Sequence, residues 1–382
     1  MRRATIAILL LGAGCRQLLG IDDPTVSSGS LDASDAVDAL VDTPSGVSCV
    51  GTLPYRVCVS AADPVVLLDN TVIDTTSDPR CAAANVAGWT STAQPMACFI
   101  VGTNISIGSL KASGSRPLVI AATDTLFVTG VIDVASHRIG NVRGPGSPSP
   151  ACAAFPVDPG ASTQGAGGGA GASFGGAGGN GGQGGDKSGG IAPPAAAAPV
   201  VLRAGCTGQS GGPGGSTATL GGGGGGAIYL AAGTTMTFKG GANITASGAG
   251  GDPSAPHGGG GGGGSGGMIV MFAQQSIEIV AGMRIVANGG GGAGGAQAGS
   301  GGAGGEANPV TGLGGGLGGA STGNAGAGGD GGSSAGVAQA GTAATIPGDG
   351  GGGGAGGGVG YIQANQTFPP GTMISPPPVI VP

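Results

Sequence analysis

Three 19-residue stretches of the chain share one alternation of apolar and polar positions. They are residues 118–136, 228–246 and 269–287, and we align them without a gap. In each, apolar side chains recur at every second residue within three short runs, which is the period of a β-strand with one buried face. The shared columns are Leu118/Ile228/Ile269, Ile120/Leu230/Met271, Ala122/Ala232/Ala273, Leu126/Met236/Ile277, Val128/Phe238/Ile279 and Val134/Ile244/Ile285.

Three copies with three short strands each, and with apolar residues at matching positions, predict an all-β fold in which the copies stack on one another. A right-handed parallel β-helix has about 20 residues per turn and places like residues above like. A hairpin meander would not require the same columns in all three copies. We therefore predict a β-helix over residues 118–382, with a decayed fourth copy at residues 362–374.

Long glycine-rich insertions separate the predicted coils, at residues 137–227, 248–268 and 288–358. The chain contains 94 glycines among 382 residues, far above the share in an ordinary globular domain. Non-glycine residues such as Phe174, Ala177 and Asn180 recur every third position. A period of three favours close-packed polyproline II helices over a flexible glycine linker.

The first residues have the features of an export signal. Arg2 and Arg3 precede a short apolar run at residues 4–11, which is too short to span a bilayer. The sequence LLGAGC resembles a bacterial lipobox, although Gly12 stands where Leu is usual. Residues 1–15 are thus predicted to be a lipoprotein signal peptide with Cys15 as the lipidated residue, anchored at the cell surface in the outer membrane. An ordinary cleaved signal peptide and secretion are the alternative.

An acidic segment and a cysteine-bearing region follow. Residues 16–46 carry spaced aspartates and predict a disordered tether. Residues 47–117 predict an N-terminal cap and first coil, or alternatively a separate disulfide-pinned domain. Six cysteines remain, and an even number in an exported chain predicts disulfides, for which we expect sequential pairing. The candidates are Cys49, Cys58, Cys81, Cys98, Cys152 and Cys206.

Candidate chemistry is sparse. Only 8% of residues are charged and the net charge is −6, which argues against a nucleic-acid partner. Among acidic residues of the repeated stretches, Asp124, Asp133 and Glu278 occupy three different columns, so we predict no catalytic residues and no enzyme. No CxxC motif occurs and His137 and His257 are the only histidines, so we expect no metal and no cofactor. His137 is interpreted as a surface histidine at a coil exit.

The chain resembles a group of exported proteins in its lipobox-like start and in the joins GGGGGGAIYL and GGGGSGGMIV. These are uncharacterised Gly-rich lipoproteins of soil bacteria, PE-PGRS-like in composition, and no PE domain is visible here. We expect a non-catalytic surface lipoprotein with a structural or adhesive role, whose partners are the membrane and polysaccharide or envelope components. The alternatives are a β-helix polysaccharide-active enzyme and an ice- or surface-binding protein. The latter would need regular hydroxyl rows, of which only Thr125, Thr235 and Ser276 form one.

Overall fold

The computed structural model describes residues 46–60, 62–81, 89, 94–215, 217–307 and 313–381. These residues belong to one compact unit that runs from Ser45 to Pro382. The predicted signal peptide, Cys15 and, apart from Gly46, the predicted acidic tether lie outside the described residues. The alternative of a separate domain at residues 47–117 is wrong, because strands from that region belong to the same sheets as the rest.

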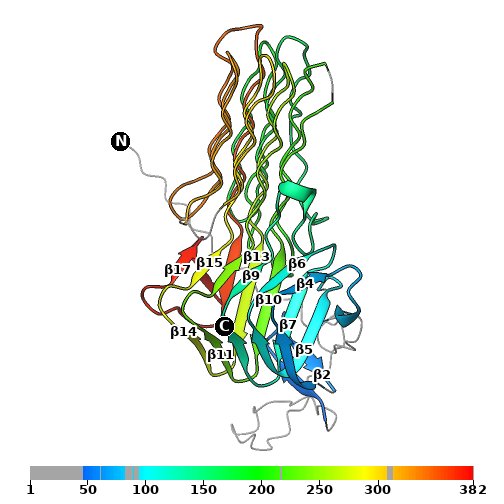
Figure 1. Ribbon diagram of the computed structural model, residues 1–382, viewed down its shortest axis with the longest axis vertical. Helices are drawn as coiled ribbons and strands as arrows, with labels where there is room; N and C mark the ends of the chain where they lie inside the picture. The colour runs from blue at the N-terminus through cyan, green and yellow to red at the C-terminus, as the bar shows by residue number, and fades with distance from the viewer. Residues whose placement is uncertain are drawn as a thin grey trace, which may run out of the picture. The chain divides into compact units, whose positions relative to one another are not determined.

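Most strands are parallel and fall into two sheets (Figure 1). The ten-stranded sheet contains β3 (Asp63–Leu68), β5 (Cys98–Ile107), β7 (Leu118–Ala122), β8 (Leu126–Val128), β10 (Ala227–Ala232), β11 (Thr235–Phe238), β13 (Met268–Ala273), β14 (Ser276–Ile279), β16 (Tyr361–Ala364) and β18 (Val379–Ile380). The six-stranded sheet contains β4 (Thr71–Asp74), β6 (Leu110–Ser113), β9 (Val131–Asp133), β12 (Asn243–Thr245), β15 (Arg284–Val286) and β17 (Met373–Ser375). A separate antiparallel pair is formed by β1 (Ser48–Val50) and β2 (Val57–Val59).

The prediction of a right-handed parallel β-helix is wrong. In a β-helix, the successive short strands of each coil belong to separate sheets. Here β5 pairs first with β7 and then, without a break, with β8, so these two strands belong to the same sheet. The two expected faces are therefore one sheet, curled like half of a barrel. Gly102 lies inside β5, and the Val66 side chain leaves no room for a Cβ there.

Parallel sheets joined by long crossovers are typical of α/β folds, in which helices make the connections. Here the long crossovers are glycine-rich segments instead. The helices in the described part of the chain are two short 3₁₀ turns, η1 (Pro79–Cys81) and η3 (Ile139–Asn141). The fold thus uses α/β-like parallel pairing, while its long connections form a bundle that extends beyond the ends of the strands (Figure 1).

The register of strand pairing matches most of the predicted columns. Ile228 pairs with both Leu118 and Ile269, and Met236 pairs with both Leu126 and Ile277. The column that contained Val134 is wrong, because Ile244 pairs with Ile132 instead. The turn before β12 is two residues longer than the turn before β9, so the copies do not align without a gap. The expected fourth copy does pair in register, with Ile362 beside Ile269 and Ile374 beside Ile285.

The hydrophobic core lies between the two sheets and has a second layer outside the larger one. Inward residues of both sheets, such as Ile120 and Ile244, form the first layer. The outward residues of β7, β10 and β13 are buried too, since Tyr55, Trp89 and Phe174 cover them. Strands buried on both faces explain why these three read as near-continuous apolar runs.

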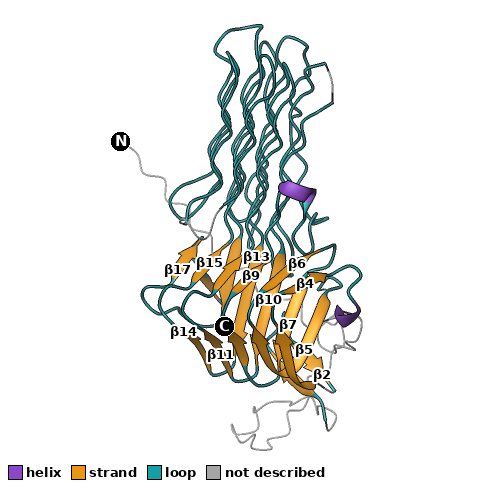
Figure 2. Ribbon diagram, viewed as in Figure 1, coloured by secondary structure: helices purple, strands orange, loops and turns teal. Residues whose placement is uncertain are grey.

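The glycine-rich insertions form an ordered bundle of extended segments (Figure 2). They contain neither α-helix nor β-strand over most of their length, yet their backbones are hydrogen-bonded side by side. Successive glycines of residues 259–264 face three different neighbours in turn, at residues 167–170, 290–293 and 220–223. A Cβ at any of these positions would overlap a neighbouring carbonyl, which is why the central segment is uninterrupted glycine.

Segments at the edge of the bundle follow a different rule. In residues 176–184, two of every three residues are glycines that contact neighbouring segments, and the third residue is not glycine and is exposed. The exposed positions are Ala177, Asn180 and Gln183. The three-residue period seen in the sequence therefore separates the packed faces of a segment from its solvent face.

Candidate functional site

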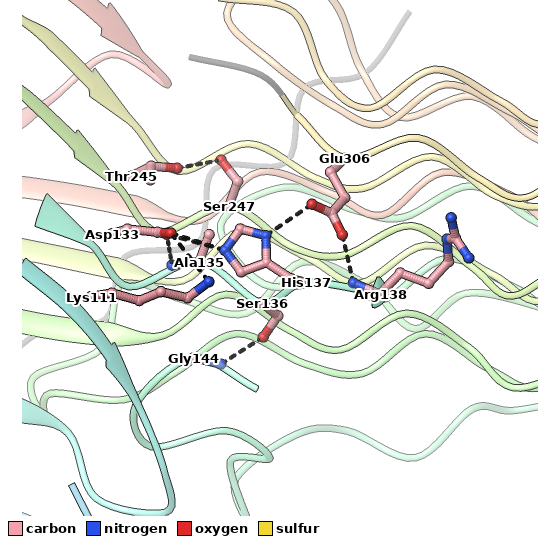
Figure 3. A network of polar contacts seen from close by, with 10 residues as sticks. All are labelled: Lys111, Asp133, Ala135, Ser136, His137, Arg138, Gly144, Thr245, Ser247 and Glu306. Carbon is pink, nitrogen blue, oxygen red and sulfur yellow. Dashed lines mark hydrogen bonds and ion pairs between the residues drawn. The ribbon is translucent and has the colours of Figure 1, made fainter. Parts of the chain in front are cut away.

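The most distinctive polar cluster lies where β9 leaves the six-stranded sheet and enters the first glycine-rich insertion (Figure 3). Asp133 ends β9, and its Oδ1 accepts a hydrogen bond of 3.1 Å from the Ala135 amide. The chain then forms a small hairpin, in which the backbones of His137 and Val142 bond each other reciprocally at 2.8 and 3.0 Å. This hairpin fixes where the His137 side chain lies.

The His137 imidazole is held between two carboxylates. Its Nε2 lies 3.0 Å from Asp133 Oδ2, and its Nδ1 lies 2.9 Å from Glu306 Oε2. The other oxygen of Glu306 accepts a hydrogen bond from the Arg138 amide. Lys111 Nζ completes the cluster at 4.0 Å from Asp133 Oδ2. We call Asp133, His137 and Glu306 the histidine clamp, because it joins the end of β9 to Glu306, which lies 169 residues beyond His137.

The electrostatics of the clamp favour a charged imidazole. Hydrogen bonds to Asp133 and then Glu306 raise the pKa of His137 from 6.5 to about 9, against the opposing effect of burial. Burial raises the pKa of Glu306, but hydrogen bonds from His137 and the Arg138 amide outweigh it, so that this pKa is lowered. At neutral pH the clamp is therefore an imidazolium between two carboxylates.

This protonation state decides what the clamp can do. A general base needs a free lone pair and a pKa near the working pH, and the His137 imidazolium has neither. The nearby Ser136 hydroxyl donates to the Gly224 carbonyl and accepts from the Gly144 amide at 2.9 Å, so the imidazole does not activate it. The clamp is suited to fastening the bundle to the sheet. His137 lies at the exit of β9, where the sequence placed a surface histidine, and its side chain is half-buried, with 26% exposed.

Two small cavities adjoin the clamp. One, of about 150 Å³, is lined by the clamp residues together with Thr245 and Ser247. The other, of about 200 Å³, lies between the hairpin and glycine-rich segments and is lined by Arg138, Arg143 and Asp252 among others. Both are below the 300–1,000 Å³ typical of pockets for drug-sized ligands.

The carboxylates considered from the sequence do not come together. Asp124 accepts a hydrogen bond of 2.8 Å from Thr234, and Glu278 lies on β14, an outermost strand of the large sheet, where it accepts a hydrogen bond of 3.4 Å from Thr237. Asp133 belongs to the other sheet and to the clamp. The single hydroxyl row is half-buried: Ser276 donates to Thr235 at 3.4 Å, and Thr125 donates to Asn104 Oδ1 at 2.6 Å.

All six candidate cysteines are paired in the sequential order expected. The bonds are Cys49–Cys58, Cys81–Cys98 and Cys152–Cys206. The third lies in the first insertion, where the Arg203 guanidinium approaches both of its sulfurs and stacks 4.7 Å from the centre of the Phe174 ring. Disulfides of this number fit an extracellular or exported protein.

Within the described residues, no group of three or more His, Cys, Asp or Glu side chains could hold a metal ion. The same part of the chain contains no helix long and apolar enough to cross a membrane. Comparisons of the chain with protein-family models, with curated proteins and with solved structures gave no match.

Proposed function

We propose that the protein is an exported, non-catalytic structural or adhesive component of a bacterial envelope or matrix. The observation that carries this proposal is the bundle, in which a large share of the chain builds a stiff element. Its exposed positions carry short and mostly uncharged side chains, such as Ala177 and Asn180. A stiff rod with a neutral surface suits contact or spacing better than it suits catalysis.

The state of the ionisable residues supports the same proposal. The clamp holds its histidine as a cation, and Asp124 and Glu278 form separate contacts with hydroxyl groups. Each of these groups has a structural partner, and they do not converge on one pocket. The proposal therefore assigns the acidic residues of the strands to stability.

Anchoring through a lipid on Cys15 is part of the proposal and rests on the sequence of residues 1–15. Growth with a clickable palmitate should label the wild-type protein and leave Cys15→Ala unlabelled. Secretion of unlabelled wild-type protein into the medium would contradict the anchor and leave the rest of the proposal standing.

Adhesion itself is tested by co-sedimentation. Purified protein is mixed with insoluble envelope and extracellular-polysaccharide fractions, and the pellet is compared with that of the reduced and unfolded protein, which controls for unspecific adsorption. We expect folded protein to be retained and to saturate. Recovery of the folded protein in every supernatant would refute an adhesive role.

A further inference from the structure

The 200 Å³ cavity beside the clamp has a lining that suits a particular kind of ligand. We call it the arginine cleft and define it by Arg138, Arg143, Thr207, Ser210, Leu220 and Asp252. Three glycine-rich stretches form its walls and bond to one another, as Gly208 to Gly222 at 2.9 Å and Asp252 to Leu220 at 3.0 Å. The hairpin at residues 137–142 forms the remaining side, so the cleft is built from rigid parts.

The cleft contains two positive charges without a close counter-ion. Neither the Arg138 nor the Arg143 guanidinium forms an ion pair within 4.0 Å in the described part of the chain. Figure 3 shows the Arg138 side chain extending away from the imidazole and from Glu306, which contacts only its backbone amide. Guanidinium groups match the planar, two-oxygen geometry of a carboxylate.

A second and independent observation points to a ligand. Thr207 lines the cleft, and its hydroxyl, which is closed off from solvent, has no hydrogen-bond partner among the described residues. A buried hydroxyl without a partner is costly, and most such groups in folded proteins are satisfied.

The other lining residues narrow the chemistry. Asp252 repels a bare polyanion but can accept hydrogen bonds from hydroxyl groups, and Ser210 can donate or accept. Leu220 is 57% exposed and offers an apolar surface of the size of one ring face. The volume admits a single small unit rather than a drug-sized molecule.

We propose that the arginine cleft binds one carboxylate-bearing sugar unit of an acidic polysaccharide. Arg138 and Arg143 bind the carboxylate, Thr207 and Ser210 bond to ring hydroxyls, and Leu220 contacts the ring. This inference rests on the proposed adhesive function and names the ligand class through which adhesion occurs.

Calorimetric titration of the full-length protein with galacturonate and glucuronate oligomers tests the cleft. Neutral glucose oligomers and inorganic phosphate are the comparison ligands. We expect binding of the acidic oligomers alone, with at least about tenfold weaker affinity in Arg138→Gln and in Arg143→Gln. Arg116→Gln, which removes the same charge outside the cleft, should bind like the wild type.

Thr207→Val separates binding from folding, because the lost hydroxyl has no partner in the protein. It should leave stability unchanged or higher and weaken binding about fivefold. Unchanged affinity in the two cleft arginine variants would overturn the cleft while leaving adhesion intact. If phosphate bound as tightly as the acidic oligomers, the cleft would be a simple anion site and not a sugar site. Failure of every acidic oligomer would refute the cleft, and only a parallel failure of co-sedimentation would also remove adhesion.

Discussion

The histidine clamp should make the stability of the protein depend on pH through one side chain. We consider His137→Gln, which keeps a hydrogen-bonding side chain but cannot carry a positive charge. In the wild type the His137 pKa is about 9 in the folded state, against 6.5 for an ordinary histidine. Because the folded pKa is the higher one, the stabilisation is complete below pH 6.5 and is lost as the pH rises through 9.

The magnitude follows from the size of this shift. With a pKa of about 9 in the folded state and 6.5 in the unfolded state, His137 adds roughly 3 kcal/mol to the free energy of unfolding at pH 5.5. The contribution is about 2.5 kcal/mol at pH 7 and nearly nothing at pH 10. The side chain is 26% exposed, so solvent screening makes these values upper limits. Glu306 acts in the opposite sense, since its lowered pKa stabilises the fold above pH 4.5 and ceases to do so at lower pH.

Denaturant unfolding between pH 5 and pH 10 measures the effect, with the fluorescence of Trp89 as the signal. Trp89 is the only tryptophan and is 1% exposed. We expect His137→Gln to lose about 2 kcal/mol at pH 7 and to have a flatter profile between pH 6.5 and pH 9. His257→Asn is the matched control, because Asn tolerates the positive φ of 58° at that position.

Two outcomes would refute this reasoning. One is a wild-type profile that is flat from pH 6.5 to pH 9. The other is a His137→Gln variant that keeps the full slope, which would place the titrating group elsewhere. A double-mutant cycle with Glu306→Gln adds a check, since contacting residues should show non-additive losses of stability.

The remaining predictions concern packing and covalent links. Gly263→Ala should cost at least about 2 kcal/mol in denaturant unfolding, because its Cβ would overlap the Gly290 carbonyl. Gly314→Ala, where a Cβ meets nothing within 4 Å, should be neutral or stabilising by about 0.5 kcal/mol, and equal losses in the two variants would contradict close packing. Replacing Cys152 and Cys206 together by Ser should cost about 4 kcal/mol, since this bond spans 54 residues; an unchanged midpoint would show that the unfolded chain gains little freedom.

The alternation of apolar residues was sufficient to place the strands of the three repeated stretches and most of their pairing. Inward columns such as Leu118/Ile228 follow from the two-residue period, which the buried core enforces. The column with Val134 failed for a physical reason. A shift of two residues keeps the same face inward, so both Ile132 and Val134 satisfy the pattern, and only the length of the preceding turn decides between them.

The overall architecture could not be derived in the same way. The curling of the large sheet depends on β5 passing through Gly102 as an extended residue, and a glycine between apolar runs is equally typical of a turn. Which of the two holds depends on the pairing of β5 with β7 and β8 on either side of this glycine. A single strand pattern does not contain that information.

The candidate site was predictable only in part. Asp133 and His137 are four residues apart, so their proximity is suggested by the sequence. Glu306 lies 169 residues beyond His137, in an insertion whose path depends on the bundle, and no local pattern connects the two. The arginine cleft likewise draws on the hairpin and on three further segments of the insertions.

The glycine pattern contained more than its period. Uninterrupted glycine at residues 258–264 marks a segment with neighbours on three sides, whereas two glycines in three at residues 176–184 mark an edge segment. This difference is visible in the sequence, because a side chain needs space beside its segment, which three close neighbours do not leave. The same rule can be applied to the remaining insertions.

The central claim is that the glycine-rich insertions are a packed element rather than linkers, and amide hydrogen exchange tests it most directly. The amides of Gly260, Gly262 and Gly263 bond to carbonyls of neighbouring segments at 2.8 to 2.9 Å and are buried. We predict that residues 258–267 exchange as slowly as β13, which follows them in the chain, because both open only when the whole unit unfolds. Exchange of these glycines at the rate of an unstructured chain, while β13 stays protected, would contradict the account.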